Sequence, residues 1–317
     1  MTFSRRSMNN NRIKIGTRGS KLALWQAGQV ESALSAAFPQ TGFEKQVIRT
    51  KGDMILDVAL SRIGDKGLFT KEIENALLNH EIDLAVHSLK DLPTELPEGL
   101  AFAGMLRRGE VRDVLISREG RKLNELTAKD KIATSSLRRR AQLLHFNQDL
   151  NIIDIRGNVD TRIKKMRDGH CDALVMAGAG IIRLGHEQLI TEYLDPFLVV
   201  PAAGQGAVAI EIREDDERML NYVSAIADDD TWTMAMAERA FLRTLEGGCQ
   251  VPVGCYCEKK GDRLLLTGIL AAVDGSKLIS RSGLCLPEEA SETAIELAFA
   301  ILDSGGQSIL QQIRPTE

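Results

Sequence analysis

The stretch RIKIGTRGSKLALWQAGQVESALSAAF, residues 12–38, contains the pattern that decides the fold. Its opening run, residues 12–18, is a short β-type segment that ends in a turn. Beyond the turn, apolar residues recur at steps of four and three, the spacing of one helix face. They are Ala23, Ala27, Val30, Leu34 and Ala37. Because Ser20 is placed to cap this helix, the stretch predicts a strand–turn–helix unit.

The same alternation of strand and helix continues beyond this unit. The runs FEKQVIRT at residues 43–50 and IDLAVHS at residues 82–88 are typical of strands. Between them, GLFTKEIENALLNH at residues 67–80 predicts a helix with Thr70 as its cap. Strand–helix–strand alternation of this kind is typical of a mostly parallel α/β sheet.

A second α/β pattern starts near residue 107, and a third segment follows it. Strands are predicted at residues 113–117, 131–135, 151–156 and 173–177. A further strand at residues 206–213 is expected to return to the first sheet. The remainder combines helices with β-rich runs, which indicates an α+β segment with an antiparallel sheet. We therefore predict three domains: residues 1–106 with 206–226, residues 107–205, and residues 227–317.

Composition restricts the class of protein. A chain of 317 residues is too long for one ordinary core, which agrees with several domains. No apolar run reaches the roughly 18 residues of a membrane-spanning helix, so no membrane partner is expected. The start MTFSRRSMNNNR has no apolar run behind its charges, and the five cysteines are an odd number. We therefore expect a cytoplasmic protein with free thiols. A monomer is expected as well, although no residue pattern specifies the oligomeric state.

The net charge of −4 conceals a basic stretch. Residues 131–170 contain nine Lys or Arg against four Asp or Glu, so this stretch is expected to face an anionic ligand. Aromatic residues make up only 4% of the chain and do not interleave with the basic ones, which disfavours nucleic acid. Duplex binding with a steep salt dependence stays as an alternative hypothesis for this stretch.

Polar and cationic residues follow one predicted strand after another. In open α/β sheets, ligands bind beyond the carboxyl ends of the strands, where helix N-termini present free N–H groups. The residues at these positions are Thr17, Arg18, Ser20, Ser88, Lys90, Asp91, Thr134, Ser135, Ser136, Arg138, Arg139, Arg156 and Arg162. In addition, Lys66 lies on a glycine loop and Arg183 follows AGAG. Each could be a helix cap or a solvated arginine, but their recurrence at strand ends favours a binding edge.

The ligand expected at this edge carries several carboxylates. Guanidinium groups match carboxylates and phosphates in bidentate geometry. The sequence has no GxxxxGK[ST] loop and no convincing GxGxxG after a strand, which disfavours a nucleotide. Asp91 is the acidic group among the cations and is expected to be ionised, so it could stabilise developing positive charge. The alternative is that Asp91 only pairs with Lys90 in a turn.

The segment LEGGCQVPVGCYC, residues 245–257, poses a separate question about its cysteines. The spacing C-x5-C-x-C matches no common zinc site and no histidine lies nearby, so no metal is expected. GCYCE is more typical of alternating strand residues. Cys249 follows two glycines that allow close approach of a ligand. It could be a nucleophile, and a thiol that is alkylated only once needs no permanent base.

Seven segments together resemble the porphobilinogen deaminase family, also called the hydroxymethylbilane synthases. They are IGTRGSKLALWQA, KGLFTKEIE, DLAVHSLKDLPT, ATSSLRRRAQL, IRGNVDTRI, PAAGQGAVAIE and AERAFLRTLEGGCQVPVG. They occur in family order and cover nearly the whole chain. The resemblance implies α/β architecture in three domains, the first two like type II periplasmic binding proteins with mixed sheets, and the third a small α+β domain with an antiparallel sheet.

The resemblance also implies a function and roles for residues. Cys249 would carry a dipyrromethane cofactor through a thioether, and Asp91 would be the catalytic carboxylate. Four porphobilinogen molecules would be joined head to tail to this primer with loss of ammonia, and hydrolysis would release hydroxymethylbilane. The cofactor and substrate would be bound by Arg18, Ser20, Lys66, Ser88, Lys90, Thr134, Ser136, Arg138, Arg139, Arg156, Arg162, Arg183 and Gln205. Phe69, with Lys66, would belong to a cover over the site. The rival hypothesis is a two-lobed binding protein for an anionic molecule, without catalysis.

Overall fold

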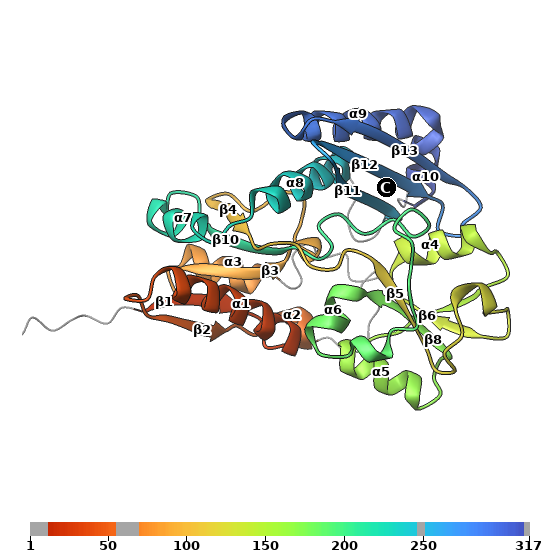
Figure 1. The fold of residues 1–317 in the computed structure, drawn as a ribbon, viewed down its shortest axis with the longest axis horizontal. Helices are drawn as coiled ribbons and strands as arrows, with labels where there is room; N and C mark the ends of the chain where they lie inside the picture. The colour runs from red at the N-terminus through yellow and green to blue at the C-terminus, as the bar shows by residue number, and fades with distance from the viewer. Residues whose placement is uncertain (1–11, 55–69, 246–250, 314–317) are drawn as a thin grey trace, which may run out of the picture.

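The computed structural model describes residues 12–54, 70–245 and 251–313. In this part of the chain, two five-stranded mixed sheets and one three-stranded antiparallel sheet form the framework. Figure 1 shows the two larger sheets side by side, with the antiparallel sheet above them. The predicted fold class, α/β with two mixed sheets and a small antiparallel sheet, is confirmed. No helix among the described residues is long and apolar enough to cross a membrane.

The first sheet has the strand order β2-β1-β3-β10-β4. Its strands are β1 (Ile13–Thr17), β2 (Phe43–Val47), β3 (Leu84–Ser88), β4 (Leu100–Met105) and β10 (Val208–Arg213). β1 pairs in parallel with β2 and β3, whereas β10 is antiparallel to both β3 and β4. The predicted return of the 206–213 strand to the first sheet is therefore confirmed. Its place between β3 and β4, and the strand β4 itself, were not predicted.

Helices cover both faces of the first sheet. They are α1 (Lys21–Ala37), α2 (Lys51–Met54), α3 (Lys71–Leu78) and α7 (Glu217–Ser224). The oxygen of Ser20 accepts a hydrogen bond from Ala23 N at 3.2 Å, so the predicted cap of α1 is confirmed. The predicted apolar face of α1 is buried except for Ala37, which is exposed beyond the last buried turn. Thr70 is the N-cap residue of α3, but its side chain makes no capping hydrogen bond.

The second sheet repeats this arrangement, with the order β7-β6-β8-β5-β9. Its strands are β5 (Asp113–Ser117), β6 (Lys131–Ala133), β7 (Asn151–Ile153), β8 (Ala173–Ala177) and β9 (Glu192–Tyr193). Its helices are α4 (Leu137–Phe146), α5 (Val159–Arg167) and α6 (Gly178–Arg183). β6 pairs in parallel with β7 and β8, and β5 is antiparallel to β8 and β9. β6 and β7 end two or three residues before their predicted limits because polar turns leading to α4 and α5 follow.

Two chain segments cross between these sheets, residues 106–112 and residues 194–207. They are joined by a hydrogen bond from Gly109 N to Gly206 O at 3.1 Å, and Leu106 N donates to Val208 O, the first residue of β10, at 3.1 Å. Gly206 has φ 87°, which disfavours other residues there. A Cβ at Gly206 would also lie 2.8 Å from Glu110 O. Only glycine therefore allows the two crossing segments to approach this closely.

The third sheet is antiparallel, in the order β11-β12-β13. Its strands are β11 (Val253–Lys260), β12 (Arg263–Ala271) and β13 (Leu278–Cys285), and its helices are α8 (Asp229–Thr244), α9 (Ala290–Ile301) and α10 (Gln307–Ile313). Cys255 and Cys257 lie on one face of β11, fully buried in a hydrophobic cluster with Phe241. The prediction of alternating strand residues in GCYCE is thus confirmed. The remaining short turns are η2 (Leu89–Asp91), η3 (Leu123–Glu125), η4 (Glu187–Leu189), η5 (Pro287–Glu289) and the π-helical η6 (Leu302–Gly306).

Glu238 on α8 ties the third sheet to both crossing segments. Its carboxylate accepts hydrogen bonds from Arg108 Nη1 at 2.7 Å and Arg108 Nη2 at 2.9 Å. It also accepts from Gly204 N at 2.7 Å and from Cys257 N at 2.8 Å. Glu238 is completely buried and the Arg108 side chain nearly so. A buried charge with all its bonds satisfied fixes how the three sheets meet.

Replacement of Glu238 by glutamine is expected to destabilise the protein by about 3–5 kcal/mol, because the Arg108 guanidinium stays buried without its counter-charge. Urea unfolding followed by circular dichroism would measure the loss. Asp168→Asn is the control, since Asp168 pairs with Lys164 on the exposed surface of α5, where such pairs contribute little. Equal stability of the two variants would contradict this prediction.

Candidate active site

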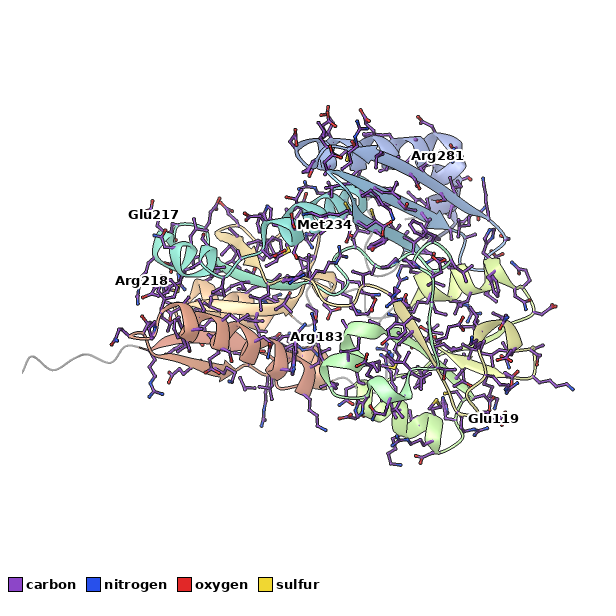
Figure 2. The ribbon with its side chains drawn as sticks, viewed as in Figure 1. Glu119, Arg183, Glu217, Arg218, Met234 and Arg281 are labelled. Atoms are coloured by element: carbon purple, nitrogen blue, oxygen red, sulfur yellow. The ribbon has the colours of Figure 1, made fainter. Side chains whose placement is uncertain are left out.

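The candidate site lies where the carboxyl ends of β3, β6 and β7 meet the crossing segments. The turn η2 follows β3 directly and carries Lys90 and Asp91. α4 and α5 begin shortly after β6 and β7, and bring in the arginines of the second sheet. Figure 2 shows Arg183 at the end of α6 that faces the first sheet. The fold thus gathers cations from both large sheets, as the pattern at the strand ends predicts.

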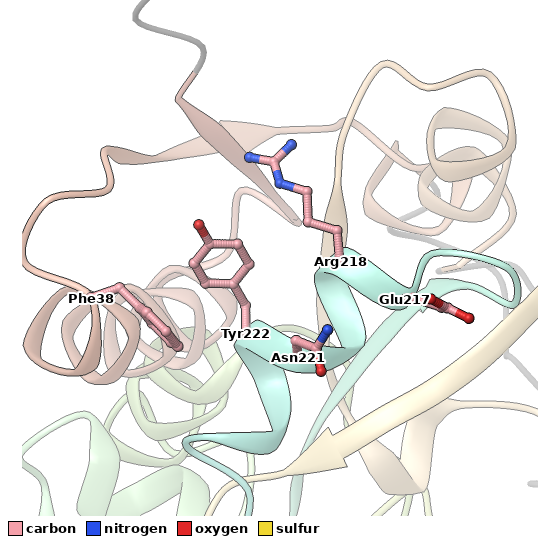
Figure 3. Close-up of a pocket in the computed structure, with 5 residues that line it drawn as sticks. All are labelled: Phe38, Glu217, Arg218, Asn221 and Tyr222. Carbon is pink, nitrogen blue, oxygen red and sulfur yellow. The ribbon is translucent and has the colours of Figure 1, made fainter.

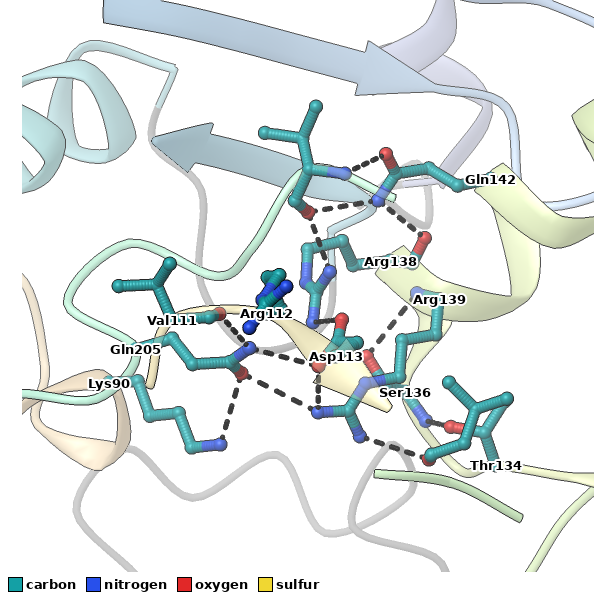
Figure 4. Close-up of polar contacts among 12 residues, drawn as sticks. Lys90, Val111, Arg112, Asp113, Thr134, Ser136, Arg138, Arg139, Gln142 and Gln205 are labelled. Atoms are coloured by element: carbon teal, nitrogen blue, oxygen red, sulfur yellow. Dashed lines mark hydrogen bonds and ion pairs between the residues drawn. The ribbon is translucent and has the colours of Figure 1, made fainter. Parts of the chain in front are cut away.

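Asp113, the first residue of β5, is the centre of a buried polar cluster (Figure 4). Asp113 Oδ2 accepts a hydrogen bond from Arg138 Nη2 at 2.8 Å. Asp113 Oδ1 accepts from Arg139 Nη2 at 2.8 Å and from Gln205 Nε2 at 2.9 Å. The alternative in which Arg139 is solvated on α4 is wrong, because only 7% of its surface is exposed.

The protonation of Asp113 follows from its partners. Burial by itself would raise the pKa of the Asp113 carboxyl. The charges of Arg138 and Arg139, with the hydrogen bonds from Arg139 and Gln205, outweigh burial and lower this pKa well below its usual range. Asp113 is therefore ionised at all physiological pH values, and it neutralises part of the arginine charge.

Lys90 joins the cluster from the first sheet. Its Nζ donates to Gln205 Oε1 at 3.3 Å. The pKa of Lys90 is lowered to about 8, mainly by burial and also by the charges of Arg139 and Arg138, while Asp91 and Asp113 oppose this shift. Lys90 is therefore a cation at neutral pH that loses its charge a little above it.

The charge of Asp91, which follows a strand of the first sheet, acts on Arg162, which follows a strand of the second sheet. Asp91 ends η2 and is exposed, whereas Arg162 on α5 donates from Nε to Gly157 O at 2.7 Å. The pKa of Arg162 is lowered to about 10, mainly by burial and also by the charges of Arg139 and Arg156, while Asp91 opposes this shift. The Asp91 carboxylate therefore lies near enough to one cation of each large sheet to affect its pKa.

Arg183 contacts both the first sheet and the crossing segment. Its Nη2 donates to Gly206 O at 2.6 Å, and its guanidinium carbon lies 5.2 Å from the centre of the Trp25 ring on α1. Burial lowers the pKa of Arg183 to about 10, so it remains a cation. Arg18, which follows β1, is half-buried at the same edge of the first sheet.

The predicted hydroxyl donors are engaged locally. Ser136 Oγ caps α4 by accepting from Arg139 N at 3.4 Å, and Thr134 Oγ1 accepts from Ser136 N at 3.3 Å. Ser88 Oγ lies 2.8 Å from Gln26 Nε2, a buried residue of α1. A capping hydroxyl that accepts a bond keeps its own O–H to donate. Ser20 and Ser136 cap their helices, Thr134 accepts a bond beside the cap of α4, and each keeps an O–H that it can donate to an anion.

Comparison with known proteins identifies the family. Residues 13–221 match the family profile described as "Porphobilinogen deaminase, dipyromethane cofactor binding domain". Residues 232–303 match "Porphobilinogen deaminase, C-terminal domain". This chain belongs to the porphobilinogen deaminase family. The resemblance seen in the sequence is confirmed.

Two curated relatives carry the name porphobilinogen deaminase. The protein of Syntrophomonas wolfei subsp. wolfei is 50% identical over 302 residues, 95% of this chain and 99% of that protein. The protein of Desulforamulus reducens is 47% identical over 307 residues, 97% of this chain and 99% of that protein. The chain therefore spans nearly the full length of these porphobilinogen deaminases.

Solved structures resemble this chain more distantly. The Bordetella pertussis BvgS VFT2 domain (a double mutant) is 12% identical with a TM-score of 0.42, and covers 69% of this chain and 89% of that chain. The substrate binding protein of an amino acid ABC transporter is 14% identical with a TM-score of 0.38, and covers 68% of this chain and 91% of that chain. The fold of this chain is defined by its own strand orders.

Three residues expected at a porphobilinogen deaminase site lie outside the described residues: Lys66, Phe69 and Cys249. Sequence reasoning missed Asp113, whereas Gln205 was found only through the family resemblance. Asp113 is a single polar residue before the apolar run VLIS, which is typical of any strand start. No local signal marks it, because its partners come from α4 and from residue 205. Within the described ranges, no group of three His, Cys, Asp or Glu side chains could hold a metal ion.

A surface hollow of about 400 Å³ lies elsewhere on this porphobilinogen deaminase family member (Figure 3). It is lined by Phe38, Glu217, Arg218, Asn221 and Tyr222. Phe38 ends α1, whereas Ser20 at the candidate site begins it. The 17 residues of α1 put the two about 25 Å apart. The hollow is therefore separate from the cationic site.

Proposed function

We propose that this chain is a transferase that joins four porphobilinogen molecules head to tail on a dipyrromethane primer, releases ammonia at each addition, and frees linear hydroxymethylbilane by hydrolysis. One observation carries this proposal. In a member of the porphobilinogen deaminase family, Asp91, Lys90, Arg139 and Arg162 come from both large sheets and act on one another electrostatically. This edge suits a ligand that carries carboxylates and develops positive charge.

The described donors fit the dipyrromethane cofactor. Each of its pyrrole rings carries an acetate and a propionate, and a partly buried carboxylate needs cations or N–H donors. The residues proposed to bind these groups are Arg18, Ser20, Lys66, Ser88, Lys90, Thr134, Ser136, Arg138, Arg139, Arg156, Arg162, Arg183 and Gln205. We assign the thioether attachment to Cys249. When bound, the cofactor supplies the pyrrole carbon to which the first substrate molecule is joined.

Asp91 is assigned the catalytic role. Its exposed carboxylate accepts hydrogen bonds from pyrrole N–H groups and stabilises the positive charge that develops as ammonia leaves. Lys90 and Arg162 place positive charges near this carboxylate. The same carboxylate can take up and return a proton as the new bond forms. Lys66 and Phe69 are assigned to the segment that covers the site.

We further propose the domain limits 1–106 with 206–226, 107–205 and 227–317, each of which includes one of the three sheets. A monomer in the cytoplasm is proposed, without nucleic-acid or membrane partners. Four described cysteines are free and buried: Cys171, Cys255, Cys257 and Cys285. Free thiols of this kind are typical of a reducing compartment.

The proposed function predicts that purified protein releases one molecule of ammonia for each porphobilinogen consumed. It also predicts an intact mass greater than that of the translated chain, by the mass of a dipyrrole. Ammonia assay and mass spectrometry measure the two results. A non-catalytic binding protein would bind porphobilinogen without releasing ammonia. That result, with an unmodified mass, would rule out the transferase and favour the binding protein.

A further inference from the structure

We propose that Asp113 is a positioning residue of this site: it holds the guanidinium groups of Arg138 and Arg139, and through Gln205 the ammonium group of Lys90, in the arrangement that binds substrate carboxylates. This inference rests on the proposed function. Asp113 is completely buried. It therefore acts through its partners and not by touching substrate.

Both carboxylate oxygens of Asp113 are committed to these partners. Oδ2 accepts from Arg138 and Oδ1 from Arg139, both at 2.8 Å, so the two neighbouring arginines of α4 are held by one carboxylate. The two arginines extend from successive positions of a helix and would diverge without a shared anion. Asp113 thus sets the separation of the two guanidinium groups.

The two arginines differ in how many of their guanidinium N–H groups remain available to a ligand. Arg138 Nη1 donates to Val200 O at 2.6 Å, so both of its terminal nitrogens are engaged and it braces α4 against the second crossing segment. Arg139 Nη1 makes only a long contact of 3.4 Å to Val175 O. Arg139 Nε is buried and has no hydrogen-bond partner among the described residues. Arg139 is therefore the member of the pair with donors available to a ligand.

Gln205 transmits the position of Asp113 to Lys90. Its Nε2 donates to Asp113 Oδ1 at 2.9 Å and to Val111 O at 2.7 Å. Because both of these partners only accept hydrogen bonds, the amide must turn its nitrogen toward them and its oxygen toward Lys90. Gln205 Oε1 then accepts from Lys90 Nζ at 3.3 Å and from Arg139 Nη2 at 3.5 Å. One carboxylate thus orients cations from both large sheets.

The pKa of Lys90 depends on the charges in this cluster and can be measured through the pH dependence of activity. The charged groups that act on Lys90 are Asp91 on its own turn, Arg138 and Arg139 on α4, and Asp113 on β5. Without the Asp113 charge, Lys90 keeps the repulsion of the two arginines and loses one of the two anions that oppose it. Its pKa, already lowered to about 8, would fall further. Lys90 binds carboxylates only while protonated, so binding would be lost at lower pH than in the native protein.

The test is the variant Asp113→Asn, assayed with porphobilinogen across pH. The expected result is an increase in KM and a decrease in kcat/KM of about 100-fold, as for a site whose binding groups move by about 1 Å. The basic limb of the kcat/KM profile, which reports groups of the free enzyme, is expected to move to lower pH. If Asp113 had only a structural role, Asp113→Asn would lower the stability of the protein and leave the basic limb of the kcat/KM profile at its native pH.

Asp130→Asn is the matched control. Asp130 is also buried and accepts from both terminal nitrogens of Arg121, at 2.5 and 3.1 Å, but it contacts none of the candidate site residues. It is expected to lose stability and to keep the native KM and pH profile. If Asp113→Asn gives the same pattern as Asp130→Asn, Asp113 has no positioning role.

A second variant covers the case in which Asp113→Asn does not fold. Asp113→Asn combined with Arg138→Gln removes one positive charge together with the negative one, and should restore folding. The proposal expects this double variant to show the raised KM with a basic limb close to the native one, because the loss of Arg138 removes a repulsion from Lys90 as the loss of Asp113 removes an attraction; a native KM would overturn it. Native protein is assayed first: absence of ammonia release there defeats the proposed function, whereas active native protein with an unaffected Asp113→Asn defeats only this inference.

Discussion

Replacement of Asp91 by asparagine is expected to lower kcat about 100- to 1,000-fold, the typical cost of removing one group that stabilises transition-state charge. KM for porphobilinogen should change little, because the cations that bind its carboxylates remain. The reason is the setting of Asp91: it is exposed, and its charge acts on Lys90 in the first sheet and Arg162 in the second. Asparagine keeps the size of the side chain and removes the charge.

Steady-state ammonia release measures this effect, and Glu95→Gln provides the control. Glu95 is an exposed carboxylate in the loop that follows η2, so its replacement removes the same charge close by. It should leave kcat within about twofold of the native value, as surface substitutions usually do. A normal kcat in Asp91→Asn would remove Asp91 from the catalytic role.

Replacement of Cys249 by alanine is expected to abolish turnover and to give protein whose mass equals that of the translated chain. Cys249 alone among the five cysteines follows two glycines in the LEGGCQVP segment. The other four are buried, and burial raises the pKa of the thiols of Cys255 and Cys257. Because the thiolate is the nucleophile, those cysteines are poor candidates for attachment.

Intact-mass measurement of the purified variants checks this assignment. Cys257→Ala is the matched control, since Cys257 lies only a few residues away on β11 and faces the hydrophobic cluster of the third sheet. This control should keep both the added mass and the activity. Added mass in Cys249→Ala, or its loss in Cys257→Ala alone, would assign the attachment to another residue.

Much of the fold could be predicted from the sequence because its signals are local. The apolar spacing in residues 23–34 places the buried face of α1, and the run VAIEI at residues 208–212, apolar except for Glu211, marks a buried strand. The polar residues after β3 and β6 could likewise be found, because strand ends and helix caps have recognisable residue types. These signals are sufficient to predict that Lys90, Asp91 and Arg139 lie at one edge of the sheets.

The contacts inside the candidate site could not be predicted in this way. Three successive arginines on a short helix are typical of a solvated face, and only the tertiary structure brings Asp113 to Arg138 and Arg139. Similarly, nothing near Gln26 indicates that its side chain is buried against Ser88. Pairing between residues far apart in sequence depends on strand order, which single-sequence patterns do not specify.

The place of β10 in the first sheet has a consequence for biosynthesis. β10 (Val208–Arg213) lies between β3 and β4, whereas the strands of the second sheet all fall within residues 113–193. During translation, residues reach the exit of the ribosome in chain order and units fold as they emerge. The second sheet can therefore assemble while the first still has a gap in its interior. The nascent chain must keep the edges of β3 and β4 from pairing wrongly until residue 213 has emerged.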